Sequence, residues 1–273
     1  MSDRIVTGAF AGLIFAALVL AAFSAPEHFS AINPELAYAP PAELLPFGAD
    51  NRGRPLLDYA TQGAQVVAVP AAAAGLLVFG FGVVGGLLRC AGSARIDSWI
   101  QAAGEILGSL PRMVVILVVA LVIPIDARGL MPLALVWALL SAPGAMDEAA
   151  AVAERLGGAR FVEALRAHGY SAFRIYLYHI VALNLRPVVV RQAVETMMQV
   201  VFLEIALSYL ALAQDQPSFT HADSLHSWAD LLNMGYPALV LDIPTLHALI
   251  LGLALVGLVA VMTLSVSRAA RAR

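Results

Sequence analysis

Two glutamates lie in one long apolar stretch in the second half of the chain. Glu195 and Glu204 both fall within residues 187–213. An ionised carboxylate inside a bilayer costs about 2.5–3.5 kcal/mol on insertion scales, so such a residue usually has a partner or a function. Glu195 is the stronger candidate for a polar path through the membrane, and Glu204 either lines that path or forms a hydrogen bond between helices. Met197 and Met198 follow Glu195 and allow two interpretations, a path for a soft metal or ordinary packing.

A second group of polar residues lies in the segment 214–243. His221, Asp223 and His226 form an H-x-D-x-x-H cluster, and Trp228 follows it. Imidazole and carboxylate groups bind transition metals, so a metal site is one interpretation. The other is a solvated loop that contacts a second protein. We favour the contact loop and predict no metal site.

Residue usage excludes several classes of protein. All 16 basic residues are arginine, and the chain has no lysine. A Walker A loop needs a lysine at the nucleotide phosphates, and Schiff-base chemistry needs a lysine amine. No residues resemble a nucleophile beside a base, and no basic and aromatic patch favours nucleic acid. We therefore expect no enzyme activity and no cofactor in this chain; any ATP and Mg²⁺ would be bound by another subunit.

The elements that position these residues are apolar helices. Of 273 residues, 60% are hydrophobic and 13% are charged, about half the charged share of a soluble domain. The composition predicts an all-α polytopic membrane protein, and the one cysteine excludes an intrachain disulfide. Six runs are long enough to span a bilayer, which takes about 20 residues. They are residues 5–23, 65–88, 102–123, 129–146, 187–213 and 244–266.

The first run, residues 5–23, is followed by small residues, as a signal peptide would be. However, it is longer than the roughly 7–15 apolar residues of a typical signal peptide, so we expect a retained spanning helix. No linker or low-complexity tract indicates a second domain, and the prediction is a single transmembrane domain over 1–273.

The arginines indicate the orientation of the spans. Cytoplasmic loops of membrane proteins carry an excess of basic residues. With the N-terminus inside, ten arginines are cytoplasmic and three, Arg52, Arg54 and Arg128, lie outside. Arg112, Arg186 and Arg191 then lie at cytoplasmic ends of spans. The outer loop 214–243 has acidic residues and no basic one. Both termini and the coupling region 147–180 are therefore expected in the cytoplasm.

An amphipathic segment lies in that cytoplasmic loop. Phe161, Val162 and Leu165 share one face of a predicted helix. Gly169 ends this helix, because glycine enters the left-handed conformation without a Cβ penalty. Ser171 is placed to cap a second helical segment, residues 173–180, which continues into the next apolar run. A short helix, a glycine turn and a second helix beside a membrane predict a docking surface.

Five short motifs in one order carry a resemblance to a known family. The segment with Phe161, Glu163, Ala164, Leu165 and Gly169 resembles the EAA loop of ABC importer permeases. Residues 47–54, 141–144, 204–210 and 227–232 resemble an LGTDDLGRD signature, an SWPG-like span end, an EASLSFLG segment and an SWGxML element of the same family. Together they resemble the C-type permease of dipeptide, oligopeptide and nickel importers, over residues 44–235.

The resemblance implies a type I ABC importer permease fold in a bacterial inner membrane. The EAA loop would be a coupling helix that docks on an ATPase, with Phe161, Glu163, Ala164, Leu165 and Gly169 at the contact. Glu163 either pairs with an arginine of the ATPase or with Arg160 or Arg166 in its own helix. The implied partners are a second homologous permease, two ATPase subunits and an extracytoplasmic solute-binding protein, which would contact His221, Asp223, His226 and Trp228.

The chain departs from the family pattern in three places, and in one of them Leu165 replaces the second Ala of the EAA triplet. Asp147 and Glu148 stand where a basic tail of span four is usual, and they either alter the ATPase contact or cap the N-terminus of a helix. Ala182 and Leu183 replace the Pro-Asn of the family's HILPN motif, which affects how the coupling segment joins span five.

The expected function is transport of peptides, or of nickel or a metallophore, by alternating access. Two rivals remain. One is a stand-alone secondary transporter or channel that uses Glu195 and Glu204 as proton or cation sites. The other is an assembly subunit with no transport path.

Overall fold

The computed structural model describes residues 2–26, 30–90, 94–124, 127–157, 160–171, 174–213, 226–240 and 245–271. The described chain is helical, and the only β interaction recorded within it is an isolated antiparallel bridge between Ala49 and Pro55. Five helices are long and apolar enough to cross a membrane, or six if one bent pair counts as a single span. The predicted all-α class and the multi-pass helical character are therefore confirmed.

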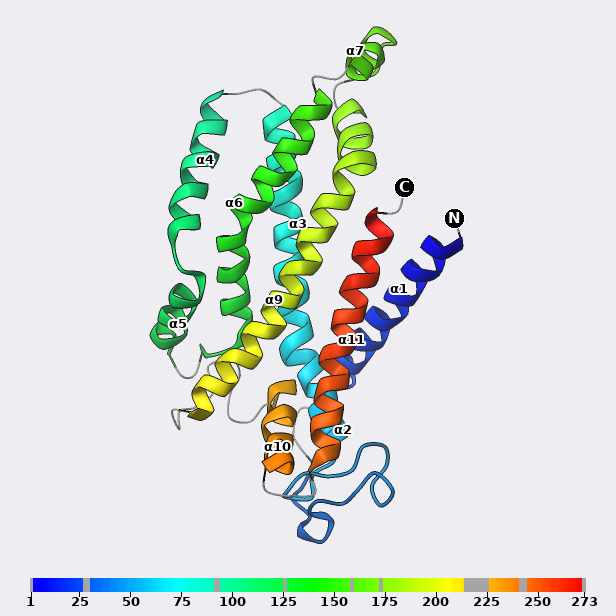
Figure 1. Ribbon diagram of the computed structural model, residues 1–273, viewed down its shortest axis with the longest axis vertical. Helices are drawn as coiled ribbons and strands as arrows, with labels where there is room; N and C mark the ends of the chain where they lie inside the picture. The colour runs from blue at the N-terminus through cyan, green and yellow to red at the C-terminus, as the bar shows by residue number, and fades with distance from the viewer. Residues whose placement is uncertain are drawn as a thin grey trace.

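The long helices form one bundle (Figure 1). They are α1 (Ser2–Phe23), α3 (Val69–Cys90), α6 (Leu130–Gly157), α9 (Arg186–Ala213) and α11 (Leu246–Arg271). Short α2 (Leu56–Gly63) runs into α3 through the π-helical turn η2 (Ala64–Ala68). The π-helix η4 (Ile175–Leu185) runs directly into α9. Ser171 Oγ accepts the Arg174 N–H at 3.3 Å, as expected from the predicted capping of the segment 173–180 by Ser171.

The predicted span 102–123 is bent in the structure. Helices α4 (Ala94–Ser109) and α5 (Arg112–Val122) meet at 76°. Pro111 is the N-cap residue of α5. Proline lacks an N–H and disfavours helical geometry at the preceding residue, here Leu110, so the helix ends and restarts at this point.

The centre of the bundle is a close packing of α3 against α6 and α9. A Cβ on Gly85 would lie 2.5 Å from Met146 Cβ, and one on Gly86 would lie 2.6 Å from Leu185 Cδ2. Small residues at such positions let membrane helices approach closely. The glycines of α3 therefore fix where α6 and the junction of η4 with α9 lie.

The two ends of the bundle carry different elements (Figure 1). The short helix α7 (Arg160–Ala167) lies at one end, and the N-terminal end of α1 and the C-terminal end of α11 point to the same end. The opposite end, called here the capped end, carries the loop 30–55, α2 and α10 (Trp228–Val240). This agrees with the expectation that both termini and the amphipathic segment share one side.

One sequence interpretation is wrong. Asp147 and Glu148 do not cap a helix N-terminus, because both lie in the interior of α6, well beyond its first turn. Glu148 instead forms an ion pair with Arg191 of α9. The apolar run ends near Met146, but the helix continues to Gly157 because Ala149, Ala150 and their neighbours favour it.

Candidate functional site

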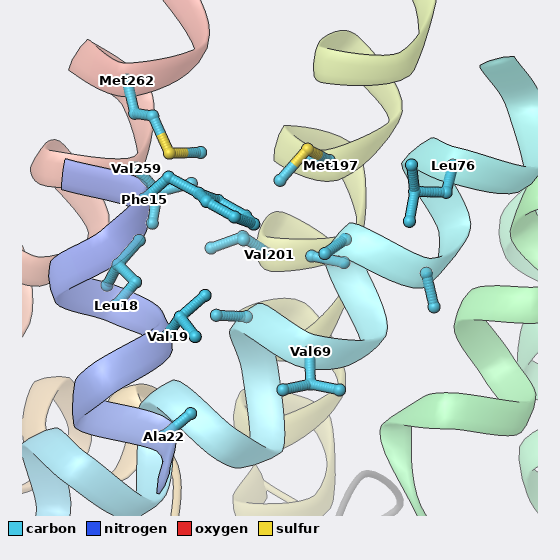
Figure 2. A pocket seen from close by; sticks show the side chains of 14 residues that line it. Phe15, Leu18, Val19, Ala22, Val69, Leu76, Met197, Val201, Val259 and Met262 are labelled. Carbon is cyan, nitrogen blue, oxygen red and sulfur yellow. The ribbon is translucent and has the colours of Figure 1, made fainter. Parts of the chain in front are cut away.

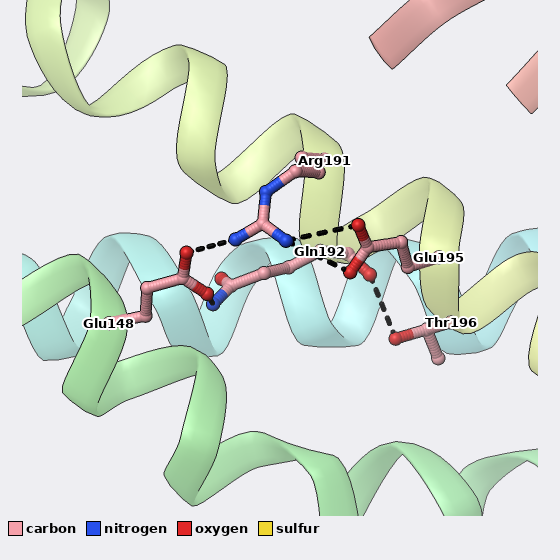
Figure 3. Close-up of polar contacts among 5 residues, drawn as sticks. All are labelled: Glu148, Arg191, Gln192, Glu195 and Thr196. Carbon is pink, nitrogen blue, oxygen red and sulfur yellow. Dashed lines mark hydrogen bonds and ion pairs between the residues drawn. The ribbon is translucent and has the colours of Figure 1, made fainter. Parts of the chain in front are cut away.

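A network of charged and polar side chains joins α6 to α9 (Figure 3). The Arg191 guanidinium donates to both Glu195 carboxylate oxygens, at 3.0 and 3.2 Å, and to Glu148 Oε1. Gln192 Nε2 donates to Glu148 Oε2 at 2.6 Å. Arg191 thus lies between two carboxylates, one from each helix. We call Glu148, Arg191, Gln192 and Glu195 the ion network.

Packing and backbone contacts hold the ion network in place. Gln192 and Thr196 are buried, and the Thr196 hydroxyl donates to the Gln192 carbonyl at 2.9 Å (Figure 3). The Arg191 and Glu195 side chains are 25% and 51% exposed. The network is therefore buried on α9 at Gln192 and Thr196 and open at Glu195.

The open side continues along one face of α9. Glu195, Gln199, Phe202 and Tyr209 are all exposed, at steps of four, three and seven residues that keep them on one helical face. Gln199 Oε1 accepts the Trp137 Nε1–H at 2.9 Å, which ties this face to α6. A glutamate and a glutamine facing hydrocarbon would be costly. This face is therefore suited to water or to a partner protein.

The other pathway candidates lie elsewhere on α9. Met198 is partly buried and packs against the hydrophobic core. Glu204 is completely buried, and Ser208 Oγ donates to its Oε1 at 3.1 Å. Ser227 and Asp230, at the start of α10, lie close to the Glu204 carboxyl. Of the three predicted residues, only Glu195 lies on the exposed face.

The motif around Asp50 folds into a buried polar centre at the capped end. Asp50 is 2% exposed, and its carboxylate accepts the backbone N–H groups of Arg52 and Arg54 and the Tyr59 hydroxyl, each at 2.8 Å. The side chain thus organises the turn that leads into α2.

A second motif, at the start of α10, packs against the first. The His226 ring lies against Tyr59 with 4.9 Å between ring centroids, and the backbone N–H of His226 donates to Gln62 Oε1 at 3.3 Å. Trp228 is fully buried, and its Nε1–H donates to the Ala60 carbonyl at 3.1 Å. Three segments that carry the family resemblance, near residues 50, 204 and 228, therefore meet at this end.

The start of α10 is a capping box. Ser227 Oγ accepts the Ala229 N–H at 3.2 Å, and the Asp230 carboxylate accepts the Ser227 N–H at 2.8 Å. His226 Nδ1 lies 3.3 Å from the same Asp230 oxygen. His226 and Trp228 are thus inside the capped end, whereas His221 and Asp223 lie outside the described residues. Among the residues that are described, no group of three or more potential metal ligands occurs.

The amphipathic segment forms α7 with the predicted glycine stop. Gly169 has φ +79°, its N–H donates to the Arg166 carbonyl at 2.9 Å, and the Tyr170 N–H donates to the Leu165 carbonyl at 3.1 Å. This pair of bonds is the Schellman motif. A Cβ on Gly169 would meet no atom within 4 Å, so the glycine is needed for its conformation and not for space.

The predicted docking residues lie on this helix. Glu163 and Ala164 are exposed and Leu165 is half-buried, whereas the Phe161 side chain lies outside the described part. Among described residues, α7 has no packing interface with the bundle comparable to those of the long helices. The side of α7 that carries Glu163 and Ala164 is therefore open to another molecule.

Sequence reasoning missed most of the ion network. Glu148, Gln192 and the Trp137–Gln199 contact join residues more than 40 positions apart, which no local spacing reveals. The Arg191–Glu195 ion pair could have been predicted from the sequence, because opposite charges at i and i+4 are neighbours on a helix.

The fold and these clusters define a helical, multi-pass type of membrane protein with a short amphipathic helix at one end. No protein-family model matches the sequence, and no curated protein matches it.

Proposed function

We propose that this chain is the permease subunit of an ATP-driven ABC importer for peptides or a related solute. It would pair with a second, homologous permease, two ATPase subunits and an extracytoplasmic solute-binding protein. A nickel or metallophore importer is the alternative within the same class.

The observation that carries the proposal is α7. It is a short amphipathic helix at the end of the bundle, with an exposed surface and a fixed Schellman stop at Gly169. The same segment carries the resemblance to the EAA loop. The adjoining η4 runs into α9 as one continuous helix. Force applied to α7 by an ATPase would therefore reach the helix that bears Glu195.

The exposed face of α9 is the proposed half of the translocation path. It offers Glu195, Gln199 and Tyr209 to the side where the second permease would lie. Closure of the ATPases would move α7 and shift α9 against α6, and the ion network lies between those two helices. The subunit would contribute coupling and a path, without hydrolysing ATP.

The test is a pulldown of the tagged chain in mild detergent, followed by ATPase and transport assays in liposomes. A second permease and an ATPase should co-purify. Gly169→Val should leave the complex assembled but lower transport per ATP hydrolysed about tenfold, because a β-branched residue with positive φ is strained by about 1–2 kcal/mol. Gly169→Asn is the matched control, since asparagine tolerates this conformation, and it should transport normally.

Phe161→Ala tests the proposed apolar contact with the ATPase and should uncouple in the same way. Recovery of the chain alone, or normal coupling in both Gly169→Val and Phe161→Ala, would contradict the proposal. Transport without any ATPase would favour a stand-alone transporter that uses Glu195.

A further inference from the structure

Two adjoining cavities lie between α1, α3, α9 and α11. Their volumes are about 280 and 450 Å³. They share Phe15, Leu76, Met197 and Met262 as walls, so together they form one groove. We call this the α1 groove. Figure 2 shows the smaller of the two cavities. None of the four residues of the ion network lines the α1 groove.

The walls of the α1 groove are apolar along its length, with one exception. Arg186 is the only charged residue among the described residues that line it. Arg186 begins α9 and is exposed, and it shares its part of the groove with Gly8 near the start of α1 and Ala269 near the end of α11. The charged part of the groove therefore lies toward the end of the bundle that carries α7.

The groove opens to the outside of the bundle. Phe15 is 49% exposed and Leu76 is 71% exposed, and both belong to helices able to cross a membrane. In a bilayer, the contents of such an opening come from hydrocarbon rather than from water.

The dimensions favour a thin chain over a helix. On α1 the groove extends from Gly8 to Ala22, which at 1.5 Å per residue is about 21 Å. One leaflet of a bilayer core is about 15 Å thick, and a spanning helix needs the full ~30 Å. A helix is also about 10–12 Å wide with its side chains, so one turn fills roughly 420 Å³ or more. The two cavities together hold less than two such turns.

We propose that the α1 groove binds one acyl chain of a membrane phospholipid with an anionic headgroup. The lipid belongs to the leaflet on the α7 side, and its phosphate lies at Arg186. The guanidinium suits a phosphate because its N–H groups match the phosphate oxygens in pairs. Arg268, exposed on α11 beside Ala269, adds positive charge at the same end.

The first test fills the groove without disturbing the fold. Gly12 lines the groove, and a Cβ there would meet no atom within 4 Å, so Gly12→Leu should be accommodated. Gly257→Leu is the matched control, since Gly257 is equally open but does not line the groove. Native mass spectrometry of the purified full chain, with whatever subunits co-purify, measures bound phosphatidylglycerol. Gly12→Leu should lower its occupancy at least tenfold, and Gly257→Leu should not change it.

The second test removes the headgroup contact. Arg186→Gln should weaken phosphatidylglycerol binding about fivefold, as expected for one arginine near an anionic headgroup, and should leave phosphatidylcholine binding nearly unchanged. Arg155→Gln, which removes an exposed arginine from the last turn of α6, is the control and should have no effect.

Three outcomes would overturn the proposal. One is normal lipid binding by Gly12→Leu, and another is equal binding of both lipids by the unaltered chain. The third is a photo-cross-link from Leu76 to another subunit rather than to lipid in the assembled complex. None of these measurements uses ATP or transport, so their failure is distinct from failure of the proposed importer function.

Discussion

The capped end and the α7 end of the bundle are tied together in different ways. At the capped end, buried polar side chains connect elements far apart in the sequence. Asp50 fixes the loop to Tyr59, and Gln62 joins α2 both to His226 and to the Pro26 carbonyl, with bonds of 2.8 to 3.3 Å. At the other end, the contacts described for α7 and its stop are mainly local, and Glu163 is exposed.

The difference indicates which end is built to stay fixed. Buried polar groups that are fully bonded specify one arrangement, because any other arrangement leaves them without partners. An exposed helix with local bonds is free to contact a second molecule and to move with it. The ion network is intermediate between the two ends in its burial, because Gln192 is buried and the Glu195 carboxylate is exposed.

The largest loss of stability is expected from Asp50→Ala. The change removes the acceptor of two backbone N–H groups and of the Tyr59 hydroxyl. Tyr59 is only 4% exposed. Each unmet buried group costs about 1–3 kcal/mol, so the unfolding free energy should fall by about 3 kcal/mol or more. Thermal unfolding in detergent, followed by circular dichroism, measures it.

Asp50→Asn is the control for that experiment. Asparagine keeps one acceptor oxygen for the Arg52 and Arg54 N–H groups, which both bond to Oδ1, so it should lose less stability than alanine. Equal unfolding temperatures for Asp50→Ala and the unaltered chain would mean that the capped end is not held by its polar centre.

A smaller loss is expected from Gly63→Ala at the same end. The added Cβ would lie 2.1 Å from Trp228 Cδ1, and Trp228 is fully buried and bonded to Ala60. Overpacking of this kind costs about 1–3 kcal/mol. The same thermal measurement applies. Gly80→Ala in α3 is the matched control, because its Cβ would meet no atom within 4 Å and alanine favours a helix.

The sequence was sufficient for features that depend on neighbouring residues. The long apolar helices follow from length and hydropathy, and the stop at Gly169 and the cap at Ser171 follow from backbone geometry within a few positions. Pro111 is a local signal for the bend between α4 and α5. The high hydropathy of residues 102–123 as a whole nevertheless led to the prediction of one straight span.

The sequence was not sufficient for contacts between distant helices. Glu148 and Arg191 are 43 positions apart, and only the close approach of α6 and α9 brings them together. The same applies to Glu204. It is buried beside the start of α10 and away from the exposed face of α9, and the sequence around it does not reveal either fact.

The smallest effect on stability is expected from Glu195→Gln in the ion network. The Glu195 side chain is 51% exposed, and its partner Arg191 retains Glu148 on α6. Exposed i, i+4 ion pairs contribute about 0.3–0.5 kcal/mol, and glutamine still accepts a hydrogen bond from Arg191. The unfolding temperature should therefore shift by less than it does in Gly63→Ala, as measured by the same thermal scan.

Glu195→Gln sharpens the comparison because stability and transport should separate in it. If the exposed face of α9 lines the path, transport of positively charged solutes should fall while the fold remains intact, since one negative charge leaves that face. A loss of stability as large as that of Asp50→Ala would instead mean that Glu195 is held as the capped end is held. The boundary between the fixed and the movable part of the bundle would then lie beyond the ion network, closer to α7.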